Sequence, residues 1–191
     1  NPSDIYWYQG GVNKPGRFEK FPLHLDENFP LTVLDTNTTL SELLDNGRLD
    51  AIISPEVPLC FYSNKKNIRR LFENFPKIEK EYFQKTGIFP IMHALGIRND
   101  IYSQNPWLAE ELYKVFLESK RIAEQDLLET RALKIGLPWL LEHVSDTQEL
   151  MGKDIWPYGI DDNFKTLQTS LNYVRDQGLV NHDMQVKDLF V

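Results

Sequence analysis

The residues of this chain that are best suited to chemistry are those that would hold a small organic anion. Gln9, Gly10 and Gly11 follow a short aromatic run at residues 5–8, where a predicted strand ends in a loop, and Arg17 lies further along that loop. Glycines let the backbone approach an anion closely, and ligands gather at the strand ends of open parallel sheets. These residues predict an anion-binding loop, and the alternative is a plain turn.

Hydroxyl groups occur at two further positions that suit the same ligand. Thr39 and Glu42 match the capping-box pattern, which predicts that a helix begins there and offers backbone amides and a positive dipole end to a carboxylate. Ser41 adds a hydroxyl to this helix start, and Ser54 follows a third predicted strand. The alternatives are an ordinary capped helix at Thr39 and a turn at Ser54.

One histidine, His93, lies in an otherwise apolar run at residues 90–98. We expect this run to form a strand, in which alternation would place His93 and Arg98 on opposite faces. They need not share a site. A lone histidine in such a setting is either a core residue with its hydrogen bonds satisfied or a catalytic group.

The elements that must position these groups predict an α/β fold with a small, mainly parallel sheet. Residues 1–98 are expected to form an α/β lobe that ends in a return hinge strand. Residues 99–191 are expected to form a C-terminal helical part that packs on this lobe or on a missing first lobe. Strands are predicted at 5–8, 31–34, 49–53, 68–72 and 90–98, and helices at 39–46, 78–85, 105–133, from 138, and from 161 or 162 to 178.

Composition excludes several classes of partner. The net charge of −7 from 21 basic and 28 acidic residues argues against nucleic acid, because no basic excess is available to bind phosphates. No apolar run is long enough to predict a membrane span. The single cysteine, Cys60, excludes an internal disulfide, and we expect it to be buried. The sequence has no spacing typical of a metal site, and we expect no cofactor.

Taken in order along almost the whole chain, the motifs resemble those of the 4,5-dihydroxyphthalate decarboxylase family. They are QGG at residues 9–11, PGRFEK at 15–20, TLS at 39–41, LDAI at 49–52, TGIFPIMH at 86–93, NPW at 105–107, LPW at 137–139 and WPYG at 156–159. The family is similar in fold to the type II periplasmic solute-binding proteins. The resemblance therefore implies two α/β lobes around a cleft, of which this chain would lack most of the N-terminal one.

The resemblance implies non-oxidative decarboxylation of an aromatic ortho-dicarboxylate. Such a reaction needs groups that hold the retained carboxylate and an acid that protonates carbon. By physical reasoning, Arg17 and the start of the Thr39 helix would hold the carboxylate and His93 would be the acid. The alternative is a solute-binding or ligand-sensing protein for a small organic acid. The decarboxylase hypothesis predicts a cytoplasmic protein, and the alternative a periplasmic or extracellular one.

Overall fold

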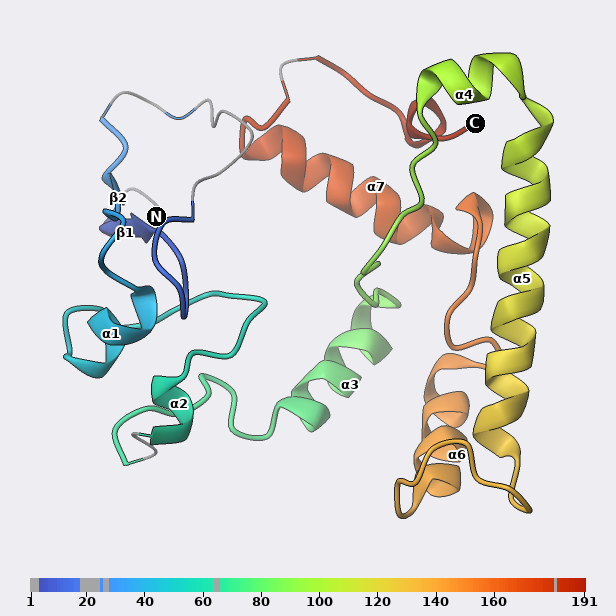
Figure 1. The fold of residues 1–191 in the computed structure, drawn as a ribbon, viewed down its shortest axis with the longest axis horizontal. Coiled ribbons are helices and arrows are strands. Elements are labelled where there is room, and N and C mark those ends of the chain that lie inside the picture. Colours follow the sequence, from blue (N-terminus) through green and yellow to red (C-terminus); the bar gives the residue numbers. More distant parts are fainter. Residues whose placement is uncertain (1–3, 18–24, 26–27, 64–65, 181) are drawn as a thin grey trace. The chain divides into compact units, whose positions relative to one another are not determined.

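Aromatic and β-branched residues form two short strands at the predicted positions. In the computed structural model, which describes residues 4–17, 25, 28–63, 66–180 and 182–191, β1 spans Trp7–Gln9 and β2 spans Leu31–Val33. The strands pair in parallel, with Trp7 opposite Leu31 and Gln9 opposite Val33 (Figure 1). The chain is therefore α/β with a small parallel sheet, as the sequence predicts.

The described chain divides into two compact units, residues 1–75 and 76–191. The first unit contains the two strands, helix α1 at Leu40–Asp45 and the short helix α2 at Cys60–Ser63. Both ends of α1 follow local sequence signals: Thr39 caps its first turn, and Gly47 takes the left-handed conformation after its end, with φ of 67°. The division expected at residue 98 from the change to helical character stays a prediction.

Two strands expected in the first unit do not form. Residues 49–53 and 68–72 have no strand structure, and Ile53 and Leu71 are both 89% exposed. The parallel pairing that does form lies between β1 and β2. A short apolar run predicts a buried strand only when a neighbouring strand is there to bind its amides and carbonyls, and these two runs have none among the described residues.

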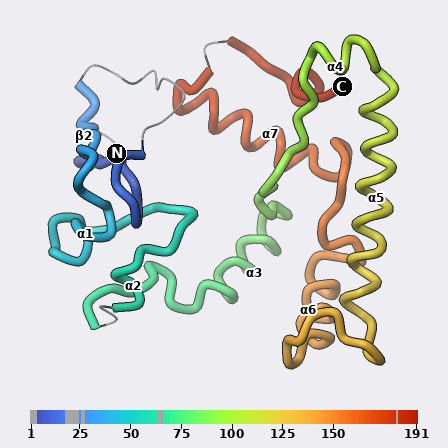
Figure 2. Tube along the Cα trace, viewed as in Figure 1, coloured from blue at the N-terminus to red at the C-terminus, as the bar shows by residue number. Residues whose placement is uncertain are grey.

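The second unit contains helices joined by extended segments and turns. Its helices are α3 at Phe75–Thr86, which begins at the last residue of the first unit, α4 at Asn99–Gln104, α5 at Trp107–Leu128, α6 at Leu140–Met151, α7 at Ile160–Asp176 and the 3-10 helix η2 at Val186–Leu189. The tube in Figure 2 shows that α6 turns back beside the C-terminal half of α5. The connection between them contains Trp139 at φ of 59°, a left-handed conformation that is rare for a bulky side chain.

Several predictions for the second unit are corrected. Residues 90–98 form an extended segment without strand pairing, so the strand expected there does not form, and its role as a return hinge stays a prediction. Asn105 does not cap α5, because Pro106 holds the cap position and no side-chain cap hydrogen bond forms. The side-chain amide of Asn105 instead donates to the carbonyl of Ile101 in α4, a helix that the sequence did not predict. Helix α5 ends at Leu128 rather than near residue 133, and α7 is capped by Gly159, with Asp161 and Asp162 in its first turn.

Each unit has its own small core. In the first unit Val12, Leu40, Leu43 and Cys60 are buried, which confirms the expectation for the cysteine. In the second unit the buried apolar residues are Val144, Leu171 and Val186. Many larger apolar side chains of both units stay partly exposed.

Candidate functional site

The two parallel strands deliver the chain to the same edge of the sheet. The amide of Leu34, directly after β2, donates to the carbonyl of Gln9 at the end of β1 over 2.8 Å. The loop that follows β1 and the connection from β2 to α1 therefore start side by side. This is the strand-end location at which the sequence predicts an anion-binding loop.

The loop after β1 covers the start of α1. The carbonyls of Gly11 and Val12 accept hydrogen bonds from the amides of Leu40 and Ser41, at 2.9 and 3.0 Å. The next amide, that of Glu42, donates to the Thr39 hydroxyl, and the Thr39 amide donates to the Glu42 carboxylate. The expectation that this helix start offers free amides to a carboxylate is therefore wrong, because the protein's own oxygens occupy them.

Close packing explains why glycine stands at positions 10 and 11. A Cβ on Gly10 would lie 2.9 Å from the side chain of Leu34, and a Cβ on Gly11 would lie 1.7 Å from the carbonyl oxygen of Lys14. The second distance is far below van der Waals contact, and the obstacle is backbone. The backbone after β1 is thus tightly packed, with the carbonyl of Gly11 bound to the start of α1, and any approach of a ligand to these glycines stays a prediction.

The predicted hydroxyl groups also have partners within the first unit. Ser41, which is 6% exposed, accepts a hydrogen bond from the amide of Cys60, and Ser54 accepts one from the amide of Glu56 in a turn. Thr39, also 6% exposed, serves the helix cap. The structure thus brings Gln9, Gly10, Gly11, Thr39 and Ser41 together in one hydrogen-bonded cluster, while a role for them in binding a substrate stays a prediction.

Asn13 is the residue of this cluster that the sequence analysis missed. Its side-chain nitrogen donates to the carbonyl of Val57 at 3.0 Å, and its side-chain oxygen accepts from the amide of Leu59 at 2.7 Å. One carboxamide therefore fastens the loop after β1 to the segment that precedes α2. An asparagine close after a glycine pair is a usual turn residue, so nothing in the sequence distinguishes it.

A carboxylate in the connection from β2 to α1 has a changed acidity. The amide of Asn37 donates to Asp35 at 3.0 Å, and this hydrogen bond, followed by one from the Thr38 hydroxyl, lowers the pKa of Asp35 below its ordinary value. The side chain is fully exposed. Its charge lies at the same strand end, so a bound anion would have to avoid it.

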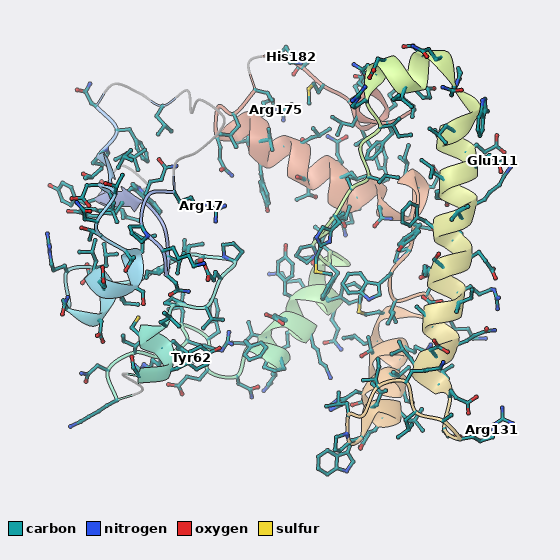
Figure 3. All side chains as sticks on the ribbon, in the orientation of Figure 1. Arg17, Tyr62, Glu111, Arg131, Arg175 and His182 are labelled. Atoms are coloured by element: carbon teal, nitrogen blue, oxygen red, sulfur yellow. The ribbon has the colours of Figure 1, made fainter. Side chains whose placement is uncertain are left out.

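Two predicted ionic residues of the anion site are accessible, and they lie in different units. Arg17 is exposed in the loop after β1, where its side chain projects outward (Figure 3). His93 is exposed in the extended segment after α3, not inside an apolar strand. Glu19 and Lys20 of the PGRFEK motif lie outside the described residues. Arg98 binds Asp100, and this hydrogen bond raises the pKa of Arg98 and lowers that of Asp100.

Two pockets among the described residues lie in the second unit. The larger has a volume of about 220 Å³ between α5 and α6, with Glu124, Leu128 and Val144 in its wall. The smaller lies beside α7 and includes Arg175 and His182. None of the predicted site residues lines either pocket. Within the described residues, no cluster of three or more histidine, cysteine or acidic side chains could hold a metal ion, and no helix could cross a membrane.

Comparison with known proteins places the chain beside two decarboxylases. No family model matches it. It is 36% identical over 188 residues to the 4,5-dihydroxyphthalate decarboxylase of Comamonas testosteroni, a match that covers 98% of this chain and 57% of the relative. It is 35% identical over 72 residues to the enzyme of the same name from Pseudomonas putida, covering 38% of this chain and 28% of that relative. The chain spans little more than half the length of the first relative. Over nearly all of its own length, it is a relative of the 4,5-dihydroxyphthalate decarboxylases, which confirms the resemblance seen in the sequence motifs.

Proposed function

We propose that the full-length protein is a non-oxidative decarboxylase of an aromatic ortho-dicarboxylate such as 4,5-dihydroxyphthalate. The observation that carries this proposal is the similarity to a decarboxylase of that name over 98% of the chain. If the protein is this decarboxylase, we expect it to act in the cytoplasm. Nothing in the composition opposes it, since a small dianion needs only a local cationic site in a protein of net charge −7.

We propose further that the first unit belongs to a lobe of the type II periplasmic-binding-protein kind. The parallel pairing of β1 and β2, and the meeting of two loops at the carboxyl ends of these strands, support this assignment. In such a lobe the loop after β1 faces the ligand. The relative is longer than this chain, and we expect the part that this chain does not match to supply the opposite wall of the cleft.

The reaction sets two requirements on the protein's side chains. When the bond between the ring and one carboxylate breaks, carbon dioxide leaves and the electron pair stays on the ring carbon. An acid then donates a proton, which forms a C–H bond with this electron pair. The other carboxylate must be held meanwhile by cations or N–H donors. For 4,5-dihydroxyphthalate the product is 3,4-dihydroxybenzoate.

We assign the retained carboxylate to Arg17 and the proton to His93. Arg17 is exposed and carries a guanidinium, which can bind a carboxylate through two parallel hydrogen bonds. The exposure of His93 supports its role, because an accessible imidazole can exchange the proton that each turnover consumes. Gln9 at the end of β1 is a further polar group for the same ligand. With their hydroxyls engaged inside the first unit, Thr39, Ser41 and Ser54 are expected to act through the shape of the loops.

The test is the release of carbon dioxide from 4,5-dihydroxyphthalate by the full-length protein and by its His93→Ala variant. Loss of a general acid should lower kcat about 100-fold or more. His143→Ala is the matched control, because His143 is also an exposed histidine, lies in α6 and has no assigned role, and it should retain activity. Tight binding of an unchanged acid without carbon dioxide release would refute the enzyme and identify a solute-binding protein instead.

A further inference from the structure

The connection between α6 and α7 carries an aromatic segment that several contacts hold in place. Trp156 contacts Phe89 edge to face, with ring centroids 5.2 Å apart and ring planes at 80°. Both side chains are 39% exposed, so neither ring is buried in a core. An aromatic pair in this state leaves ring surface accessible to a further planar ring.

A nearly buried lysine fixes Trp156 from one side. Lys120 of α5, whose side chain is 10% exposed, binds an oxygen of Asp154 at 2.5 Å, and the same oxygen accepts the amide of Trp156 at 3.1 Å. The ammonium also lies 5.0 Å from the ring centroid of Tyr158. One carboxylate oxygen therefore joins the backbone of Trp156 to a cation that is almost out of solvent.

Two further contacts complete the hold on this connection. The side-chain amide of Asn163 in α7 donates to the carbonyls of Pro157 and Gly159, at 2.7 and 2.9 Å. The hydroxyl of Tyr113 in α5 donates to the carbonyl of Tyr158 at 3.4 Å. The WPYG motif is therefore bound to α5 and α7 through its backbone carbonyls, and these hydrogen bonds do not involve the Trp156 ring.

The segment that carries Phe89 is held in the same manner. The amide of Ile88 donates to the Thr86 hydroxyl at 3.1 Å, and the ammonium of Lys165 in α7 binds the carbonyl of Thr86. Gly87 turns the chain there at φ of 64°. The lysine also places a positive charge at the start of the segment, which suits a ligand that is both aromatic and acidic. His93, the proposed acid, belongs to this same extended segment.

We propose that Phe89 and Trp156 form an aromatic platform that binds the ring of the substrate, and that Lys120 and Asp154 are positioning residues that hold Trp156 in it. This inference rests on the proposed function for its ligand class, a planar aromatic diacid. The polar contacts hold the backbone that carries the two rings, and the rings contact each other edge to face, so the platform is largely formed before the ligand arrives. The platform favours an aromatic ring over a saturated one, while the positive charge of Lys165 attracts the carboxylates.

The experiment compares two acids whose carboxylates are placed alike but whose rings differ. Binding of phthalate and of cis-cyclohexane-1,2-dicarboxylate to the full-length protein is measured by titration calorimetry. The wild type should prefer phthalate, and Phe89→Leu and Trp156→Leu should each reduce this preference by about threefold to tenfold, the usual size of an aromatic contact. Affinity for the saturated acid should change by less than about twofold.

Phe116→Leu is the matched control, because Phe116 in α5 is 43% exposed, close to the value for Phe89, and lies outside the platform. It should keep the preference for phthalate. Trp156→Phe retains a ring and should also keep most of it, which guards against a variant that merely folds poorly. Equal weakening of both acids in Trp156→Leu, an unchanged preference, or no binding of either acid by the wild type would overturn the inference.

The positioning role has its own readout. Lys120→Met should reduce the preference for phthalate in the wild type but should not reduce it further in Trp156→Leu, whereas Lys120→Arg should retain it. An equal loss in both backgrounds would overturn the positioning role. Carbon dioxide release separates the two proposals: a protein that shows the expected changes in preference but releases no carbon dioxide refutes the decarboxylase, and an active enzyme whose preference is insensitive to Phe89 and Trp156 refutes the platform.

Discussion

Replacing Gly11 by alanine should detach the loop after β1 from helix α1. The new methyl carbon would lie 1.7 Å from the carbonyl oxygen of Lys14 and 2.8 Å from its carbonyl carbon. Both atoms belong to the backbone, so no side-chain rotation relieves the contact. The loop must move by more than an ångström, which is enough to break the hydrogen bonds from Leu40 and Ser41 to the carbonyls of Gly11 and Val12.

The size of the effect follows from these two bonds. A backbone hydrogen bond contributes about 1 kcal/mol net, so their loss should destabilise the helix start by about 2 kcal/mol. At about 1.4 kcal/mol for each factor of ten, this is about a 30-fold increase in the opening of this region. The amides of Leu40 and Ser41 should therefore exchange with deuterium about 30-fold faster than in the wild type.

Residue-resolved hydrogen exchange measures this directly. The amide of Leu43, which binds the Thr39 carbonyl inside the helix, should be affected less than those of Leu40 and Ser41. Gly136→Ala is the matched control, because a Cβ there would meet no atom within 4 Å, and it should leave exchange in α1 unchanged. If the Gly11→Ala variant protects Leu40 and Ser41 as well as the wild type does, the inference that the loop carbonyls cap α1 is refuted.

Two further predictions concern the same region. Thr39→Ala should destabilise α1 by about 1 kcal/mol, because the Glu42 amide loses its acceptor, while Thr39→Ser should retain most of the stability; equal urea midpoints for wild type and Thr39→Ala would contradict the cap. The second prediction concerns Asp35, whose pKa is lowered in the folded protein. Its hydrogen bonds therefore stabilise the fold above the unfolded pKa of about 3.9, and this contribution is lost as the pH falls through the folded pKa. An NMR titration should show the pKa of Asp35 rising toward its ordinary value in Thr38→Val, and an unchanged pKa would exclude the Thr38 hydroxyl as a cause.

Features that depend on neighbouring residues could be predicted from the sequence. The capping box at Thr39 and Glu42 and the helix stop at Gly47 are complete within a few residues, and the structure confirms both. The motifs that point to the decarboxylases are likewise read directly along the chain. The order of these motifs along the chain is enough to indicate the relatives without any structural feature.

Features that depend on a distant partner could not be predicted. The apolar runs at 49–53 and 90–98 have strand composition, but a strand forms only where another strand is available to pair with it. The amides at the start of α1 were expected to be free because the sequence does not show that the carbonyls of Gly11 and Val12 reach them. In both cases the outcome depends on a segment far away in the sequence.

The carboxamide of Asn13 does for the segment before α2 what a neighbouring strand does elsewhere. A side-chain amide carries the same donor and acceptor pair as a peptide group, and here it binds the Val57 carbonyl and the Leu59 amide. These two groups flank residue 58, which is the pattern that one residue of a parallel neighbouring strand would bind. Asn13 thus binds this segment as one residue of a parallel strand would. Aspartate is nearly identical in shape, but it would lose the donor and set its charge against the Val57 carbonyl.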